Sequence, residues 1–358
     1  MAKYVMDTHM HSSASDGYWR PSEVALQAHA RGLEVIALTD HDTINGQQEI
    51  IDAGKKLGLK VIPGIEIDAE YSSNGTKNGT KNGIKIEGIE LLGLNIDLEG
   101  IRDFVAARNK FRLDRMNLYI LQFNDYISRP DFADNNASSK FPLNAPTPIS
   151  LENLLLWINQ TKGFYTPEPV VFKWDIIDYV RDRFIENNTD YVNPDTFRTE
   201  YTFLLKSNGA ITNSATKDFQ KPTFQEAISA VKNAGGKAIL AHPGLSKGYQ
   251  GGMFKEWMLN EKEWFGEKAN PNQRFTPYVF IKELIESTPP NAGLDGVELY
   301  FYSGNDKNHS QFEAHINKYF RMLARKLGLI TTYGSDCHGP GKKDIKMGRF
   351  GSERIYEL

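Results

Sequence analysis

The chain has 358 residues, of which 40% are hydrophobic and 24% charged, and its formal net charge is −3 at pH 7. These values exclude a disordered or fibrous chain and fit a globular protein with one large domain or two smaller ones. The slightly acidic balance offers no basic signature for duplex DNA, so we expect no duplex DNA to bind.

Neither a membrane span nor a disulfide framework is expected. No apolar run approaches the ~18 residues that cross a bilayer, and the N-terminal residues lead directly into the first predicted strand without the apolar core of a signal peptide. Cys337 is the only cysteine, which excludes an intramolecular disulfide and fits a reducing compartment. We therefore predict a cytoplasmic protein.

The first part of the chain alternates strands and helices. In chain order, the hydrophobic pattern predicts a strand at 4–6, a helix at 23–31, a strand at 35–38, a helix at 44–57 and a strand at 60–62. Ser22 and Thr43 are expected to cap the two helices, and Gly58 to end the second. This rhythm with short connections predicts parallel βαβ units.

The pattern changes after the third strand. Residues 65–97 read as an antiparallel hairpin, because two strand-like segments flank tandem Asn-Gly-Thr-Lys units and Asn-Gly is a strong hairpin signal. Beyond it come helical patterns at 101–123, 150–160, 172–186 and 194–208, with a loop-like stretch at 128–148. We predict that residues 101–221 form an inserted, mostly helical subdomain, and that residues 1–100 and 222–358 together form the α/β domain.

After residue 222 the sequence again predicts strands alternating with helices. Thr223 followed by Glu226 is a capping-box pattern that opens a helix. The remaining predicted elements are this helix to 233, a strand at 237–241, an excursion at 246–276, a strand at 296–300, a helix at 310–326 and a strand at 329–333.

Histidines and carboxylates recur where predicted strands end. His9 and His11 are spaced i, i+2, so their side chains would face the same way on an extended backbone, and Asp336 and His338 repeat this spacing. An isolated His-x-His pair is equally expected in a polar loop with solvated histidines. The residues at or just after a predicted strand end are His9, His11, His41, Glu66, His242, Asp336 and His338. Because functional side chains converge at this edge of barrels and parallel sheets, and imidazole with carboxylate suits zinc, manganese or iron, the positions favour a metal site.

These residues fall in five short segments. In chain order they are Asp7-x-His9-x-His11-Ser12, Thr39-Asp40-His41-Asp42, Pro63-Gly64-Ile65-Glu66, Ala241-His242-Pro243 and Gly334-Ser335-Asp336-x-His338-Gly339. The set resembles the motifs of the PHP (polymerase and histidinol phosphatase) superfamily, in particular its bacterial nucleotide phosphoesterase and RNase-like subgroup. The resemblance implies an α/β fold, a distorted (β/α)7 barrel, and a metal-dependent phosphoric ester hydrolase with two or three divalent ions (Mn, Fe or Zn) at the strand ends.

The resemblance also implies a ligand set. One ion would be held by His9, His11, Glu66 and Asp336, a second by Asp16, His41 and His338, and a third by His242 with bridging Glu66. Where the family has a further histidine for the third ion, this chain has Glu90. Glutamate changes the charge and softness of the site, so two outcomes stay open: Glu90 binds the third ion, or only two ions are held tightly.

The implied chemistry is attack on phosphorus by a water that the ions acidify toward pKa ~7. The resemblance gives catalytic roles to Asp40, His242 and His338, and substrate-binding roles to Arg112, Arg115 and His309. Asp7 and Asp40 are expected to accept imidazole N–H bonds and so to fix the ring tautomers, with Glu298 either similar or only structural.

The expected substrate is a small phosphorylated compound. The resemblance implies a nucleotide, such as a nucleoside 3′,5′-bisphosphate or an AMP-like monoester, or the 5′ end of a short RNA. Leu245 stands where the subgroup has an arginine after His-Pro, so substrate recognition is expected to differ from that of close relatives. Two other functions stay open: a histidinol-phosphate phosphatase, and a non-catalytic metal-binding module.

Overall fold

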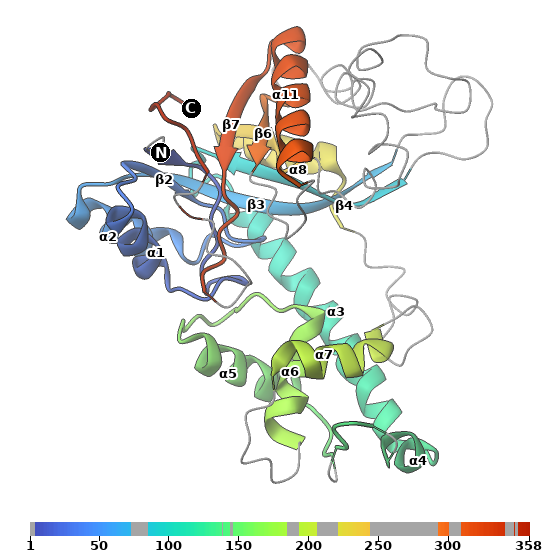
Figure 1. The fold of residues 1–358 in the computed structure, drawn as a ribbon. Helices are drawn as coiled ribbons and strands as arrows, with labels where there is room; N and C mark the ends of the chain where they lie inside the picture. Colours follow the sequence, from blue (N-terminus) through green and yellow to red (C-terminus); the bar gives the residue numbers. More distant parts are fainter. Residues whose placement is uncertain are drawn as a thin grey trace, which may run out of the picture. The chain divides into compact units, whose positions relative to one another are not determined.

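The structure of the protein is a computed structural model, which describes residues 4–72, 85–137, 139–143, 146–184, 193–205, 221–243, 293–300, 309–340, 347 and 350–358. The chain divides into two compact units (Figure 1). Met1–Val105 and Lys221–Leu358 form the first unit, and Ala106–Gln220 form the second. Among the described residues, no helix is both long and apolar enough to cross a membrane.

The first unit is built on a seven-stranded mixed sheet whose strands lie side by side in chain order. The strands are β1 (Met6–Asp7), β2 (Val35–Leu38), β3 (Lys60–Ser72), β4 (Lys85–Leu94), β5 (Lys237–Leu240), β6 (Gly296–Tyr300) and β7 (Ile330–Gly334). Strands β1 to β3 are parallel, as are β5 to β7, whereas β4 is antiparallel to both of its neighbours. The predicted hairpin after the third strand is thereby confirmed, and its Asn-Gly-Thr-Lys tip lies outside the described residues.

The two outer strands of the sheet approach each other and nearly close it into a barrel. The Thr8 N–H donates to the Tyr333 carbonyl at 3.0 Å, and the Asp336 N–H donates to the His9 carbonyl at 2.9 Å. At the opposite end of β1, the Val5 N–H donates to the Ser352 carbonyl at 2.8 Å. The fold is therefore the distorted (β/α)7-type barrel that the sequence predicts, distorted because β1 is only two residues long and irregular backbone completes the closure.

Four helices cover the barrel wall: α1 (Pro21–Ala30), α2 (Gln47–Leu57), α8 (Phe224–Asn233) and α11 (His309–Leu327). Along β3, Ile65, Ile67 and Ala69 belong to the same buried cluster as the apolar face of α8. Ile62 belongs to a separate cluster with residues of β2, β4 and β5. Since successive side chains of a strand alternate between faces, Glu66 shares the face of Ile62 rather than that of the helix-packed residues.

Two predicted helix starts are wrong. Ser22 does not cap α1; Arg20 is the capping residue, and its N–H donates to Glu23 Oε2 at 2.8 Å. Thr43 does not cap α2, because its hydroxyl accepts the Asn45 N–H within the connecting turn, and the helix begins only at Gln47. The capping box of Thr223 is confirmed, and Gly58 ends α2 in the left-handed conformation as predicted.

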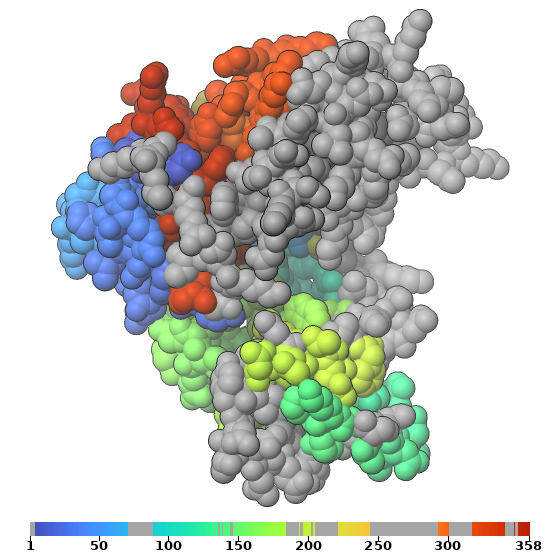
Figure 2. All heavy atoms as spheres, in the orientation of Figure 1, coloured from blue at the N-terminus to red at the C-terminus, as the bar shows by residue number. Residues whose placement is uncertain are grey.

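The regular elements among the described residues of the second unit are helices. It contains most of α3 (Arg102–Ser128), followed by α4 (Phe132–Ala137), α5 (Leu151–Lys162), α6 (Lys173–Phe184), α7 (Pro194–Tyr201) and a 3-10 turn at Thr202–Leu205. The short helix α4 interrupts the stretch 128–148 that was expected to be loop. A core of its own includes Phe123, Trp157 and Phe197. Figure 2 shows the α4 region beside α7 on one face, in line with Ser139 Oγ lying 3.2 Å from Glu200 Oε1.

Candidate metal centre

The structure brings the predicted strand-end residues together in the first unit. Three groups of histidines and carboxylates each offer ligand atoms within 4.8 Å of one another. The groups are His9, His11 and Glu66; His11, Asp16, His41 and His338; and His41, Glu66 and Glu90. Because His11, His41 and Glu66 each belong to two groups, the three groups form one continuous centre.

The first group surrounds a point between the end of β1 and the middle of β3, because β3 continues past its predicted end at residue 62 and contains Glu66. The Nε2 atoms of His9 and His11 lie 3.1 Å apart, and each is 3.2–3.3 Å from Glu66 Oε2. His9 Nδ1 lies 2.9 Å from Glu298 Oε1, so it donates its proton there and Nε2 is directed into the group. Glu66 Oε2 is buried and accepts no hydrogen bond from any described residue. Two imidazole nitrogens and a carboxylate oxygen that face one another in a buried site fit a bound cation, which would replace the imidazole protons of the metal-free centre.

Asp336 completes this side of the centre. Its Oδ1 lies 3.0 Å from His11 Nε2 and 3.6 Å from His9 Nε2. Its other oxygen accepts the Tyr300 hydroxyl proton at 3.1 Å. Asp336 therefore has one oxygen fixed by Tyr300 and the other directed at the two histidines.

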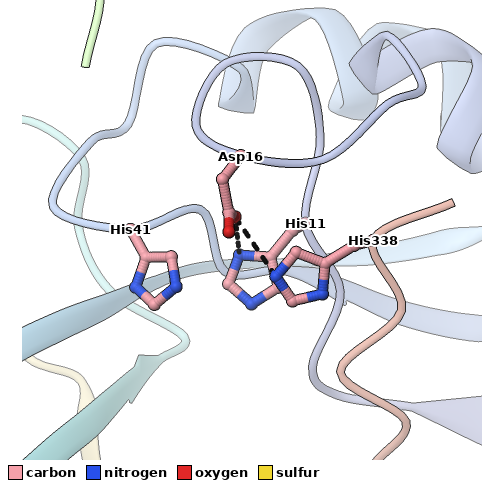
Figure 3. Close-up of side chains that lie close together, drawn as sticks. All are labelled: His11, Asp16, His41 and His338. Carbon is pink, nitrogen blue, oxygen red and sulfur yellow. Dashed lines mark ion pairs between the residues drawn. The ribbon is translucent and has the colours of Figure 1, made fainter. Parts of the chain in front are cut away.

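The second group lies around Asp16 (Figure 3). The imidazoles of His41, His11 and His338 lie in a row below the Asp16 carboxylate, with ring centroids 4.7 Å and 4.2 Å apart along the row. Asp16 Oδ1 is 3.2 Å from His338 Nε2 and 3.7 Å from His11 Nδ1. His338 Nδ1 donates to the Asp336 carbonyl at 2.9 Å, which again leaves Nε2 unprotonated toward the group.

The third group adds residues from the antiparallel part of the sheet. His242 Nε2 lies 3.0 Å from Glu66 Oε1 and 3.3 Å from Glu90 Oε2. Glu90 is paired across the strands with Asp68 and shares the face of Leu92. Since β4 runs opposite to its neighbours, the residue that reaches the centre comes from the middle of this strand rather than from its C-terminal end.

The charges of the histidines and carboxylates are strongly coupled. Burial raises the pKa of the Glu66 carboxyl, but the positive charges of His9 and His41 outweigh this and hold it well below its usual range. Burial lowers the pKa of His11, yet its close contacts with the Asp336 and Glu66 carboxylates raise it to about 10. Without a cation, the centre therefore compensates its carboxylates with protons on imidazoles.

The His242 and Glu90 side chains differ from this pattern. Burial, reinforced by the negative charge of Glu66, raises the pKa of Glu90 to about 7. For His242 burial acts downward, but the hydrogen bond with Glu66 and the charge of Glu90 raise its pKa to about 9. Burial lowers the pKa of His338, so this ring is neutral at pH 7 and able to act as a ligand.

The residues that support the centre differ from those expected. Asp7 and Asp40 were expected to accept imidazole N–H bonds, but Asp7 accepts the backbone N–H groups of Ser335 and His9. The two oxygens of Asp40 accept hydrogen bonds at 2.6–2.7 Å from the Ser12 backbone and hydroxyl and from the Ser15 hydroxyl. Asp40 therefore anchors the loop that carries Asp16.

Glu298 has the role that was expected of these aspartates. It accepts His9 Nδ1–H, and its Oε2 accepts the His242 backbone N–H at 2.7 Å. Gly334 makes room for it, because a Cβ there would lie 1.9 Å from Glu298 Oε1 and 2.4 Å from His9 Cβ. Neither Gly334 nor Tyr300 was predicted to support the centre. Tyr300 is two residues after Glu298 in the same strand, so the two side chains lie on the same face of the sheet.

Two of the three predicted substrate-binding residues belong to the second unit. Arg112 and Arg115 are on α3 in the helical unit, where their guanidinium groups lie over the rings of Phe172 and Tyr119. His309 is the first residue of α11, and its side chain lies outside the described residues.

Comparisons with known proteins agree with the geometry. A family described as PHP domain matches residues 7–188. A 5′-3′ exoribonuclease of Haemophilus influenzae is 40% identical over 91 residues, which are 25% of this chain and 28% of that protein. A phosphoribosyl 1,2-cyclic phosphate 1,2-diphosphodiesterase of Eggerthella lenta is 24% identical over 335 residues, 94% of each chain.

A solved structure shares the fold. It is described as a metal-dependent phosphoesterase from Bifidobacterium adolescentis, and it superimposes with a TM-score of 0.55 at 21% identity. The match covers 95% of this chain and 89% of that one. At this identity the likeness concerns the fold alone.

Proposed function

The chain belongs to the PHP domain family, and on this premise we propose that it hydrolyses a phosphate ester of a nucleotide or of the 5′ end of a short RNA, using divalent ions at the strand ends. The protein is a metal-dependent phosphoric ester hydrolase. The observation that carries the proposal is the environment of Glu66 Oε2. Three imidazole nitrogens, from His9, His11 and His41, approach this buried oxygen to 3.2–3.3 Å, and it accepts no hydrogen bond from the described residues.

The donor set suits Mn, Fe or Zn, because imidazole and carboxylate are their common ligands. We assign one ion to His9, His11, Glu66 and Asp336, a second to Asp16, His41 and His338, and a third to His242, Glu66 and Glu90. Ions bound here would lower the pKa of a water to ~7 and neutralise phosphoryl oxygens.

The chain's own residues prepare this chemistry. Glu298 fixes the His9 tautomer, and Asp40 holds the loop of Asp16, so we assign positioning roles to both. His338 is neutral and presents Nε2 beside Asp16. His242 Nε2 lies beside Glu66 and Glu90, where it would hold the third ion or, without that ion, supply a proton to the leaving oxygen.

The substrate class follows from the chemistry and the relatives. A centre with several cations favours a dianionic or trianionic ester over a neutral one. One relative is named as an exoribonuclease and another as a 1,2-cyclic phosphate 1,2-diphosphodiesterase, so diesters are candidates beside the monoesters that the resemblance to nucleotide phosphoesterases implies. We propose nucleotides, namely a nucleoside 3′,5′-bisphosphate or an AMP-like monoester, and 5′-phosphorylated short RNA.

The test is release of inorganic phosphate from the monoesters, and of nucleotides from the RNA, by chelator-stripped protein reconstituted with Mn²⁺, Fe²⁺ or Zn²⁺. The substrates are a nucleoside 3′,5′-bisphosphate, AMP, a 5′-phosphorylated RNA and histidinol phosphate. His242→Asn should abolish hydrolysis while the fold is kept, because asparagine tolerates the positive φ of 20° at this position. His29→Asn, on the exposed face of α1, is the matched control and should retain full activity.

Each alternative has its own outcome. A wide preference for histidinol phosphate would replace the nucleotide proposal by a histidinol-phosphate phosphatase. No turnover with any reconstituted ion would identify a non-catalytic metal-binding module. Wild-type rates in His242→Asn would show that the site is wrongly placed.

A further inference from the structure

The three places at which the centre can hold an ion differ in the atoms that they offer. The second group has three imidazoles and one carboxylate, as Figure 3 shows. The first ion would have two imidazoles and two carboxylates, from His9, His11, Glu66 and Asp336. A third ion would lie beside His242 Nε2, which is 3.0 Å from Glu66 Oε1 and 3.3 Å from Glu90 Oε2. We call this place the third position.

Carboxylates outnumber imidazoles at the third position. His41 also approaches Glu66, with its Nδ1 atom 3.3 Å from Oε2, but a neutral imidazole has one lone pair and binds one ion only. As a ligand of the second ion, His41 leaves His242 as the imidazole of the third position among the described residues. The other donors there are the carboxylate oxygens of Glu66 and Glu90.

The sheet places a further carboxylate beside these two. Asp68 lies opposite Glu90 in the antiparallel pair of β3 and β4 and two residues after Glu66, so the three side chains share one face. The Asp68 carboxylate forms an ion pair with the Lys221 ammonium, and the Lys221 backbone N–H donates to Glu70 Oε1 at 3.1 Å. Two adjacent strands therefore give the third position a carboxylate-rich surrounding.

The imidazole of the third position lacks a support that two of the other rings have. His9 Nδ1 donates to Glu298, and His338 Nδ1 donates to the Asp336 carbonyl. The Nδ1 atom of His242 is buried, and no described residue forms a hydrogen bond with it. Because such a bond orients a ligating ring and raises its basicity, His242 is a weaker zinc ligand than His9 or His338.

The third position is also more open to water than the first. The Glu90 side chain is 26% exposed, whereas the His9 and His11 side chains are 0% exposed. Mg²⁺ and Mn²⁺ prefer carboxylate oxygens, and Mg²⁺ keeps several waters in its octahedral shell. Zinc is bound mostly by imidazole and thiolate in fourfold coordination. Oxygen donors and access to water both fit a hard ion better than zinc.

We propose that the third position selects a hard, oxygen-preferring ion of the Mg²⁺ or Mn²⁺ type, while the first two positions hold imidazole-preferring ions such as zinc. The inference rests on the proposed function, because it concerns the ions of the same centre. It makes Glu90 the residue that sets the metal specificity of the third position, and it makes the loaded protein a mixed-metal one.

The test is metal binding by the full chain, stripped with a chelator and then loaded with zinc in a large excess of Mg²⁺. Elemental analysis after gel filtration counts the zinc ions that stay bound. Electron paramagnetic resonance of free Mn²⁺ measures the affinity of the zinc-loaded protein for Mn²⁺.

Three variants accompany the wild type. Glu90→His gives the third position a second imidazole, and Glu90→Gln removes the charge at nearly the same size. Glu34→His is the matched control, because it adds an imidazole at an exposed residue of the same unit. Thermal unfolding shows whether each variant is folded.

The wild type should retain two zinc ions and bind one Mn²⁺, which excess Mg²⁺ displaces. Glu90→His should retain three zinc ions and bind Mn²⁺ at least ~10-fold more weakly, since loss of even an outer partner of a metal ligand has an effect of this size. Glu90→Gln should retain two zinc ions and lose Mn²⁺ affinity to a similar degree. Glu34→His should match the wild type.

Three results would overturn the inference: three zinc ions held by the wild type despite the Mg²⁺, a zinc-loaded wild type that binds no Mn²⁺, or unchanged Mn²⁺ affinity in both Glu90 variants. Hydrolysis is measured separately. A wild type with the predicted metal content that cleaves none of the esters would refute the proposed function alone, whereas an active protein with three zinc ions would refute this inference alone. Absence of any bound zinc would refute both.

Discussion

Gly334→Ala is a sharp test of how the centre is held, because one methyl group would disturb several supports at once. The added Cβ would meet Glu298 Oε1 at 1.9 Å and His9 Cβ at 2.4 Å, whereas real Cβ contacts below 3.0 Å essentially never occur. The Glu298 carboxylate would therefore have to move by about 1 Å. Such a shift breaks its bonds with the His9 ring and the His242 N–H, which measure 2.9 Å and 2.7 Å.

The magnitude follows from these contacts. Overpacking of a tight core costs ~1–3 kcal/mol, and a hydrogen bond to a charged group contributes ~1.5–3 kcal/mol. We expect the free energy of unfolding of the metal-free protein to fall by about 3–5 kcal/mol. Loss of the partner that orients a metal-ligating histidine should weaken metal binding ~10–100-fold.

The assay combines denaturant unfolding with titration of Mn²⁺ into chelator-stripped protein. Gly100→Ala is the control: its Cβ would meet Asp97 Oδ2 at 3.2 Å and Ala234 Cα at 3.3 Å, which the neighbours relieve by shifting a few tenths of an ångström, so it should change the free energy of unfolding by about 1 kcal/mol or less. Wild-type stability and metal affinity in Gly334→Ala would refute the role of Glu298 as the group that orients His9.

Three further predictions concern the supports and the charge of the centre. Glu298→Gln should leave the fold intact and weaken Mn²⁺ binding ~10–100-fold, since an amide holds the His9 tautomer less firmly; unchanged affinity in calorimetric titration would contradict this. Asp40→Asn should lower the free energy of unfolding by ~1–3 kcal/mol, because it weakens the hydrogen bonds to Ser12 and Ser15. It should also release one of the bound ions, since these bonds hold the loop that carries Asp16. An unchanged ion count in elemental analysis would contradict this role of Asp40. The metal-free protein should lose stability as pH rises from about 6.5 to about 10. In the folded state His11 and His242 keep their protons up to pKa values of about 10 and about 9, whereas the unfolded chain has already released them in this interval. A melting temperature that rises over this interval would disprove that these two histidines are protonated in the folded state.

The parallel βαβ units and the edge at which most of the ligands meet could be predicted from short-range patterns, whereas the barrel was implied by the family resemblance. Strand ends can be located from apolar runs, and in parallel units these ends converge. His9 and His11 do bring their Nε2 atoms together, at 3.1 Å, although both residues lie beyond the two-residue strand β1. The family resemblance, not the pattern, pointed to Glu90, because β4 is antiparallel and its contribution does not follow the strand-end rule.

The supporting contacts could not be predicted for a physical reason. Glu298 was expected to be either a supporting residue or only structural, and nothing local in the sequence decides between the two roles, because its partner His9 lies 289 positions away. Asp40 sits beside a histidine in sequence, yet its hydrogen bonds go to serines of another loop. Near a helix start, several polar residues can accept the free backbone N–H groups, and the sequence does not show which one does. Thr43 accepts the Asn45 N–H in a turn that follows the positive φ of Asp42, instead of capping α2.

The most direct test of the metal centre is anomalous diffraction from crystals of the protein grown with Mn²⁺. We expect at least two anomalous peaks in the centre. One lies among His9, His11, Glu66 and Asp336, and the other among Asp16, His41 and His338; a third peak beside Glu90 would make that residue a ligand. Crystals that hold no ion between these side chains, or hold Mn²⁺ only elsewhere on the chain, would contradict the assignment of the centre.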